Sequence, residues 1–200
     1  HINHITVPEV MQVLVQDDNC KIDAFLGPSH VSVISGSKIY EEFPRDYNKP
    51  VVVSGFEPVD VMQSISMIVK QFKEKRANLE IKYKRVVSYE GNLKAQELIN
   101  KYFKKVTFKF RGIGEVENSG YELKDEFDKY NAKIVYKDIL PTQEVKENKA
   151  CKCPEILKGV AKPTDCKIFG TVCTPTNPIG SCMVSSEGAC SAYYKYGNLL

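Results

Sequence analysis

The sequence lacks several features that would place the chain in a specialised class of protein. No stretch reaches the roughly 18 apolar residues that a membrane-spanning helix needs, and His1-Ile2-Asn3-His4 has neither the basic start nor the apolar segment of a secretory signal. The net charge of +3 is too small to predict a nucleic-acid surface. We therefore expect a cytoplasmic globular protein with neither nucleic acid nor membrane as a partner. The chain also lacks an initiator Met, which suggests a piece of a longer protein.

Cysteine is almost absent from the first 150 residues, which contain only Cys20. The remaining six lie between residues 151 and 190, spaced C-x-C-x12-C-x6-C-x8-C-x7-C, and they are Cys151, Cys153, Cys166, Cys173, Cys182 and Cys190. The surrounding segment is poor in aliphatic residues and rich in turn-formers, so burial alone cannot hold it together. We expect an α/β domain over residues 1–145 and a cysteine-rich domain over 146–200 that needs a metal or crosslinks.

Three kinds of chemistry could use these cysteines, and their spacing alone leaves all three open. A structural zinc site uses four ligands and favours paired C-x2–4-C knuckles, whereas this segment has no C-x-x-C and would leave two cysteines over. A disulfide framework suits an even number of cysteines but also an exported protein. An iron–sulfur cluster held by four thiolates leaves two cysteines that could form a redox pair. Lysines outnumber acidic residues in 146–200, which favours thiolates and an anionic cluster.

The first 140 residues alternate short apolar runs with amphipathic stretches, which predicts a mostly parallel sheet flanked by helices. The run Pro50–Ser54 predicts a buried strand. The next helix begins at Glu57-Pro58 and has apolar residues near a 3.6-residue period at Val61, Met62, Ile65, Ile68, Val69 and Phe72. We also expect helices at 8–16, 30–34, 37–43, 93–103 and 125–130, strands at 22–26 and 106–110, a loop at 111–120 and a linker at 141–150. Thr6-Val7-Pro8-Glu9 is typical of a capping box.

Two motifs, Gly27-Pro28-Ser29-His30 and Gly55-Phe56-Glu57-Pro58, each follow a predicted strand and precede a helix. The carboxyl edge of a parallel sheet is where open α/β folds bind ligands, so His30, Glu57 and Asp60 are candidate cleft residues for proton transfer or partner docking. A simpler interpretation is that Glu57 and Pro58 only start a helix and that His30 makes a local hydrogen bond.

The residues that flank the cysteines identify a protein family more specifically than the cysteine spacing does. Cys151-Lys-Cys153-Pro-Glu-Ile-Leu-Lys-Gly, Asp165-Cys166-Lys-Ile-Phe-Gly, Cys173-Thr-Pro and Pro178-Ile-Gly-Ser-Cys182-Met-Val-Ser-Ser-Glu-Gly-Ala-Cys190-Ser-Ala-Tyr-Tyr-Lys-Tyr resemble the C-terminal region of the HypD family of hydrogenase maturation proteins. The resemblance continues upstream in Phe25-Leu-Gly-Pro-Ser-His30-Val-Ser and in Pro50-Val-Val-Val-Ser-Gly-Phe-Glu-Pro58-Val-Asp60, and it covers essentially the whole chain.

This resemblance implies a scaffold that assembles the Fe(CN)2CO unit of [NiFe] hydrogenases with the partners HypC and HypE. It also implies a [4Fe-4S] cluster beside a redox-active cysteine pair. Carried over to this sequence, the cluster ligands are Cys151, Cys166, Cys173 and Cys190, and the redox pair is Cys153 with Cys182.

The sequence departs from the family pattern in one respect. The family's N-terminal motifs, of the Cys-Gly-Thr-His and Gly-Pro-Gly-Cys-Pro-Val-Cys type, do not occur in this sequence, and Cys20, which stands alone, cannot replace them. We therefore expect this chain to carry the electron-relay end of the scaffold without completing iron decoration or acting as a turnover enzyme on its own. The alternative function is a partner-docking module with a purely structural cluster or zinc site.

Overall fold

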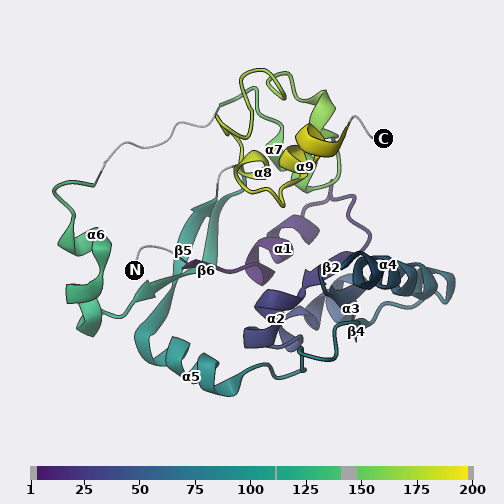
Figure 1. The fold of residues 1–200 in the computed structure, drawn as a ribbon, viewed down its shortest axis with the longest axis horizontal. Coiled ribbons are helices and arrows are strands. Elements are labelled where there is room, and N and C mark those ends of the chain that lie inside the picture. Colours follow the sequence, from purple (N-terminus) through teal and green to yellow (C-terminus); the bar gives the residue numbers. More distant parts are fainter. Residues whose placement is uncertain (1–3, 111, 141–147, 198–200) are drawn as a thin grey trace. The chain divides into compact units, whose positions relative to one another are not determined.

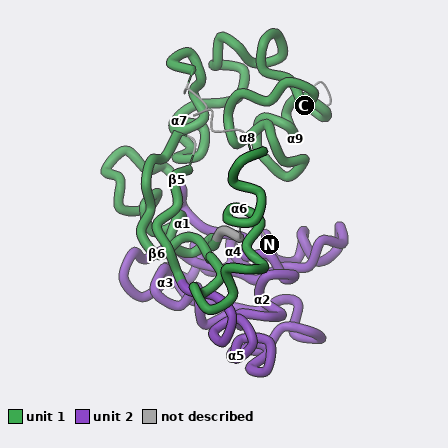
Figure 2. Tube along the Cα trace, turned by 90° about the vertical axis from the view of Figure 1, so that its left-hand side faces the viewer, with its two compact units in different colours: residues 1–21, 105–200 green, residues 22–104 purple. Residues whose placement is uncertain are grey.

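The computed structural model describes residues 4–110, 112–140 and 148–197 (Figure 1). The chain divides into two compact units, which are coloured separately in Figure 2. Unit 2 is the continuous segment Ile22–Lys104, and unit 1 combines His1–Lys21 with Lys105–Leu200. The expected boundary near residue 145 and most of the expected linker lie outside the described residues.

Unit 2 is built on a parallel sheet with strand order β2-β3-β4. The strands are β2 (Phe25–Pro28), β3 (Val51–Ser54) and β4 (Leu79–Ile81), and the helices are α2 (Ser29–Ser35), α3 (Glu42–Tyr47), α4 (Pro58–Lys73) and α5 (Leu93–Tyr102), with a 3-10 turn η1 (Lys38–Tyr40). The three valines of β3 are fully buried, as a β-branched run in the middle of a parallel sheet should be. The parallel α/β architecture predicted from the sequence is therefore confirmed.

Helix α4 is the longest helix of unit 2 and packs on β3. Its length and its N-terminal proline agree with the prediction from periodicity. Its buried side is unusual, because the residues facing the sheet are Asp60, Ser64 and Gln71. Most of the apolar residues on the helix are exposed instead.

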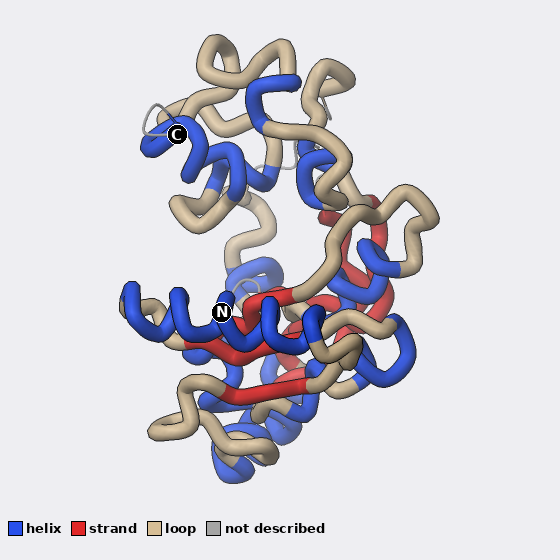
Figure 3. Tube along the Cα trace, turned by 90° about the vertical axis from the view of Figure 1, so that its right-hand side faces the viewer, coloured by secondary structure: helices blue, strands red, loops and turns tan. Residues whose placement is uncertain are grey.

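Unit 1 contains a second sheet with strand order β1-β6-β5. Its strands are β1 (His4–Ile5), β5 (Phe103–Phe110) and β6 (Gly114–Leu123), and β1 runs antiparallel to β6. The helices of this unit are α1 (Pro8–Val15), α6 (Ala132–Val135), α7 (Cys153–Leu157), α8 (Ser181–Val184) and α9 (Ala189–Tyr196), with 3-10 turns η2 (Asp125–Tyr130) and η3 (Pro163–Asp165). The cysteine-rich segment consists mostly of loops and very short helices, as Figure 3 shows.

Two sequence-based predictions in unit 1 are wrong. The segment 111–120 was expected to be a loop because of its glycines, but most of it belongs to strand β6. The strand tolerates Gly120 because that residue pairs with Ile5 of β1, and Asn118 adopts φ 55°, which asparagine accepts more readily than most residues. The N-cap of α1 is Val7 rather than Thr6, so the expected capping box does not form.

Candidate functional site: a thiol core and a charged sheet edge

The six C-terminal cysteines converge on one small core within unit 1. Five of them are buried and Cys151 is half-buried, and the aliphatic side chains packed among them include Ile156, Ile168 and Met183. Each cysteine comes from its own short element or connecting loop, and α9, the longest of these helices, has eight residues. Helices this short are not stable alone. The cohesion of this segment therefore depends on what the thiols contact.

Cys182 lies at the centre of the thiol contacts. Its backbone N–H donates to Sγ of Cys153 at 3.4 Å, and its own Sγ lies 3.1 Å from Sγ of Cys190. The two cysteines that the resemblance assigns to a redox pair, Cys153 and Cys182, are thus in contact. The geometry also offers Cys182 with Cys190 as a competing pair, so the division of the six into ligands and redox pair stays a prediction. None of the seven cysteines is joined in a disulfide in this structure.

The thiols of this core differ in acidity. A hydrogen bond from Cys182 lowers the pKa of Cys153 to about 6, helped by the neighbouring hydroxyl of Ser181, which lies 3.1 Å from the sulfur. The same contact raises the pKa of Cys182 above its usual value. Burial raises the pKa of Cys151 and of Cys190. The chain therefore holds one acidic thiol beside a thiol that keeps its proton, which is the asymmetry of many thiol–disulfide pairs.

Gly180 brings backbone close to two of the cysteines. A Cβ built there would lie 2.7 Å from Sγ of Cys151 and 3.0 Å from Cβ of Cys153, so only glycine fits. A backbone N–H also reaches Sγ of Cys173 at 3.4 Å, from Ile179. Backbone donors aimed at sulfur stabilise thiolates and thiolate-bound clusters. This donor set is chemically suited to a thiolate-ligated group, although in the described part of the chain no three or more His, Cys, Asp or Glu side chains are arranged to hold a single metal ion.

The predicted cleft residues of unit 2 lie where the sequence placed them, at the carboxyl edge of the parallel sheet. Pro28 and Ser54 are paired in register at the ends of β2 and β3. The ring of His30 in α2 packs against Phe56, with ring centroids 5.2 Å apart. Glu57 immediately follows Phe56 and is the N-cap of α4. The two motifs therefore meet at one edge.

Arg85 joins the two carboxylates of this edge and was not found by sequence reasoning. Its guanidinium donates to Glu57 at 2.8 Å and to Asp60 at 3.0 Å, and it stacks over the Tyr83 ring at 4.4 Å. Glu57 is exposed, whereas the Asp60 side chain is only 6% exposed. Gly55 makes room for this arrangement, because a Cβ there would lie 2.4 Å from Asp60 and 2.7 Å from Tyr83. The signal in the sequence was the basic cluster just after β4, a strand too short to be recognised.

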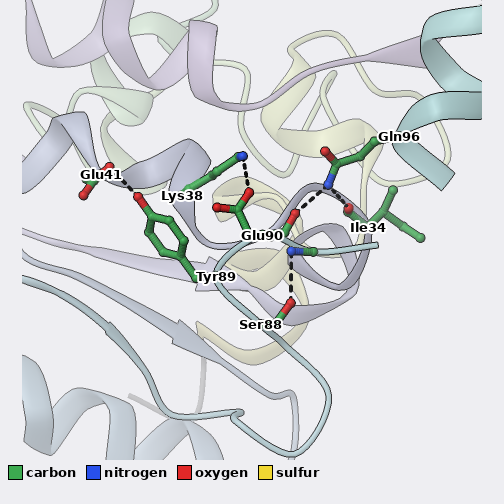
Figure 4. A network of polar contacts seen from close by, with 8 residues as sticks. Ile34, Lys38, Glu41, Ser88, Tyr89, Glu90 and Gln96 are labelled. Carbon is green, nitrogen blue, oxygen red and sulfur yellow. Dashed lines mark hydrogen bonds and ion pairs between the residues drawn. The ribbon is translucent and has the colours of Figure 1, made fainter. Parts of the chain in front are cut away.

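The loop that carries Arg85 contacts the rest of unit 2 through the residues that follow Arg85, among them Tyr89 and Glu90, as Figure 4 shows. Tyr89 donates to Glu41 at 2.7 Å, and Glu90 pairs with Lys38. The side-chain amide of Gln96 donates to the carbonyls of Ile34 and Glu90 at 2.8 and 2.7 Å. Gly36 and Gly91 bring their backbones together at the same place. We call this contact the glycine clasp, and it fixes one end of the loop.

A cavity of about 470 Å³ lies beside the clasp, between α3 and the edge strand β4. Its lining includes Glu41, Arg45, Glu80, Tyr89 and Ser37. Ser37 is fully buried, and its hydroxyl has no hydrogen-bond partner within the described residues.

The fold and site define a class of protein: an α/β unit with a charged sheet edge, joined in one chain to a core of six thiols. The family model described as "Hydrogenase formation hypA family", HypD, matches residues 1–197. This chain belongs to that family, whose members act in hydrogenase maturation. No helix among the described residues is both long and apolar enough to cross a membrane.

Relatives confirm this family membership across distant organisms. The chain is 46% identical to hydrogenase maturation factor HypD2 of Bradyrhizobium diazoefficiens over 98% of its length, and 45% identical to HypD of Cupriavidus necator over 97%. It is also 44% identical to a putative hydrogenase expression/formation protein of Methanocaldococcus jannaschii over 96%. The matches cover 53%, 52% and 53% of these relatives, so the chain spans about half of their length.

Proposed function

We propose that this chain is the iron–sulfur redox portion of a scaffold for [NiFe] hydrogenase maturation. In this proposal Cys151, Cys166, Cys173 and Cys190 hold a [4Fe-4S] cluster, and Cys153 with Cys182 forms the adjacent redox pair. The complete scaffold works with HypC and HypE on the Fe(CN)2CO unit. The iron being decorated is cargo of the complete scaffold, and its site belongs to motifs that this chain lacks.

The observation that carries the proposal is the convergence of six cysteines on one small core. Four thiolates satisfy a cluster of this type and leave a pair over. Cys153 and Cys182 are the natural pair, because the proton kept by Cys182 helps to keep Cys153 ionised. A structural zinc ion would leave two buried thiols without a role.

The redox pair would work through ordinary thiol–disulfide chemistry. Closing it joins Sγ of Cys153 to Sγ of Cys182, releases two electrons and releases the protons that the two thiols carried. Opening it consumes two electrons and restores those protons, with Cys153 leaving as the more acidic thiol. When bound, a [4Fe-4S] cluster supplies or accepts single electrons. The pair and the cluster together can therefore match a two-electron thiol step to one-electron carriers.

The first experiment is to measure iron, zinc and acid-labile sulfide on protein prepared without oxygen. We expect about four irons and about four sulfides per chain, the content of one [4Fe-4S] cluster. About one zinc per chain, without sulfide, would instead support the docking module with a structural metal site.

Single serine substitutions then separate ligands from the redox pair. Cys166→Ser or Cys173→Ser should release the iron and unfold the cysteine-rich segment, because binding and folding are coupled in so small a metal domain. Cys153→Ser should keep the iron and abolish reversible disulfide formation, measured by thiol titration across a series of redox buffers. Iron loss in Cys153→Ser would mean that the six cysteines are divided differently.

A further inference from the structure

One side of helix α4 presents a continuous row of large apolar side chains to solvent. We call this row the α4 stripe, and its members are Val59, Met62, Ile65, Val69 and Phe72. Their exposed fractions run from 42% for Ile65 to 66% for Met62. Spacings of three and four residues place all five on one side of the helix, along roughly 20 Å of its length. Proteins rarely leave so long an apolar row uncovered.

The stripe cannot be buried by rolling the helix on its sheet, because the opposite side of α4 is already committed. Ser64 donates to the carbonyl of Asp60 at 2.7 Å, and the side-chain oxygen of Gln71 accepts the backbone N–H of Asn78 at 2.7 Å. Asp60 itself is paired with Arg85. Turning the stripe toward β3 would break the contact of Gln71 with Asn78 and that of Asp60 with Arg85. Buried polar groups would then be left without partners. These interactions therefore hold the polar side of α4 against the sheet.

We propose that the α4 stripe is the docking surface for the part of a family-length protein that has no counterpart in this chain. The matched relatives carry nearly as much chain again as they share with this one. A segment attached to the same polypeptide meets the stripe at a high effective concentration, so it needs far less intrinsic affinity than a second molecule would. The occupant would present an apolar face of its own, such as one side of a helix, along the length of α4. This inference is independent of what the cysteines hold.

The test compares the accessibility of the stripe in two proteins. Met62→Cys and Val69→Cys are made in this chain and at the aligned positions of full-length HypD from Cupriavidus necator. Each protein is labelled with N-ethylmaleimide, and the rate at the introduced thiol is followed by peptide mass spectrometry. Gln63→Cys is the matched control, since it is exposed on the same helix at the polar margin of the stripe, about 100° around the axis from Met62 and about 120° from Val69.

We expect the stripe positions to react at least about tenfold more slowly in the full-length protein, as expected where docking leaves less than a tenth of molecules open. The control should react alike in both proteins. Equal rates at the stripe positions would overturn the proposal. Slow labelling of the stripe positions in this chain would also overturn the proposal. A labelling rate that is independent of protein concentration would mean that the chain covers its own stripe. A labelling rate that falls as protein concentration rises would mean that a second copy covers it.

Discussion

Replacing Gly36 by alanine should destabilise unit 2 strongly, because the glycine clasp leaves no room for a side chain. Gly36 has φ 79° and ψ 166°, a backbone region that only glycine enters without strain, and forcing alanine into it costs about 1–3 kcal/mol. The added Cβ would lie 2.2 Å from the carbonyl oxygen of Tyr89 and 2.8 Å from the backbone nitrogen of Gly91. Both atoms are backbone, so the chain itself must move, and overpacking of this kind costs about 1–3 kcal/mol more.

The sum, about 2–6 kcal/mol, is a large share of the stability of a small α/β unit. The assay should report on unit 2 alone, since a protein with more than one compact unit need not unfold in a single step. Hydrogen exchange of the amides in residues 22–104, measured by mass spectrometry at increasing urea concentrations, does this.

Gly114→Ala is the control for backbone strain without a clash. Gly114 has φ 98°, and nothing lies within 4 Å of a Cβ built there, so only the strain of about 1–3 kcal/mol remains. Its own unit is read from the amides of 105–140. If Gly36→Ala costs no more than Gly114→Ala, the close approach in the clasp is wrong.

Three further predictions concern the two candidate sites. Arg85→Met should lower the urea midpoint of unit 2, because it leaves the buried Asp60 carboxylate as an uncompensated charge. Adding Asp60→Asn to this variant removes that charge and should restore part of the loss. No recovery in the double variant would argue against the pairing. In protein with its cysteines reduced, the alkylation rate of Cys153 should rise with pH through a midpoint near 6, where its thiolate forms, and Cys182→Ala should move this midpoint upward by removing the side-chain thiol that hydrogen-bonds Cys153; an unchanged midpoint would exclude that side-chain donor. Gly180→Ala should lower the iron content because its methyl group enters the thiol core, which metal analysis against wild type would show.

The sequence predicted those features of the fold that follow from local patterns. The valine run of β3 and the period and proline of α4 identified both elements with nearly correct ends. Strand β6 was missed because glycine and asparagine usually interrupt strands, whereas its place between β1 and β5 in the sheet makes that stretch extended. Periodicity also does not show which side of α4 is buried. Here the polar side is buried, because Gln71 hydrogen-bonds Asn78 and Asp60 pairs with Arg85.

The candidate site was predictable to a similar extent. The cysteines, His30, Glu57 and Asp60 could be named because cysteine clusters and strand-to-helix turns have recognisable patterns. Arg85 could not, because it reaches Asp60 across 25 residues through a loop that has no regular pattern. The contact of Cys182 with both Cys153 and Cys190 likewise depends on the packing of α8 and α9, which sequence spacing does not reveal.

Unit 1 is discontinuous, and this has a consequence for the order in which the protein folds. Its first 21 residues pair with partners that are made only after all of unit 2: β1 with β6, and Asp17 with Lys158 at 2.5 Å. During synthesis, residues 22–104 are complete while these early residues still lack their partners. Unit 2 can therefore fold first on the ribosome. The thiol core can close only after Cys190 has emerged, so the loading of any metal group would have to follow translation of nearly the whole chain.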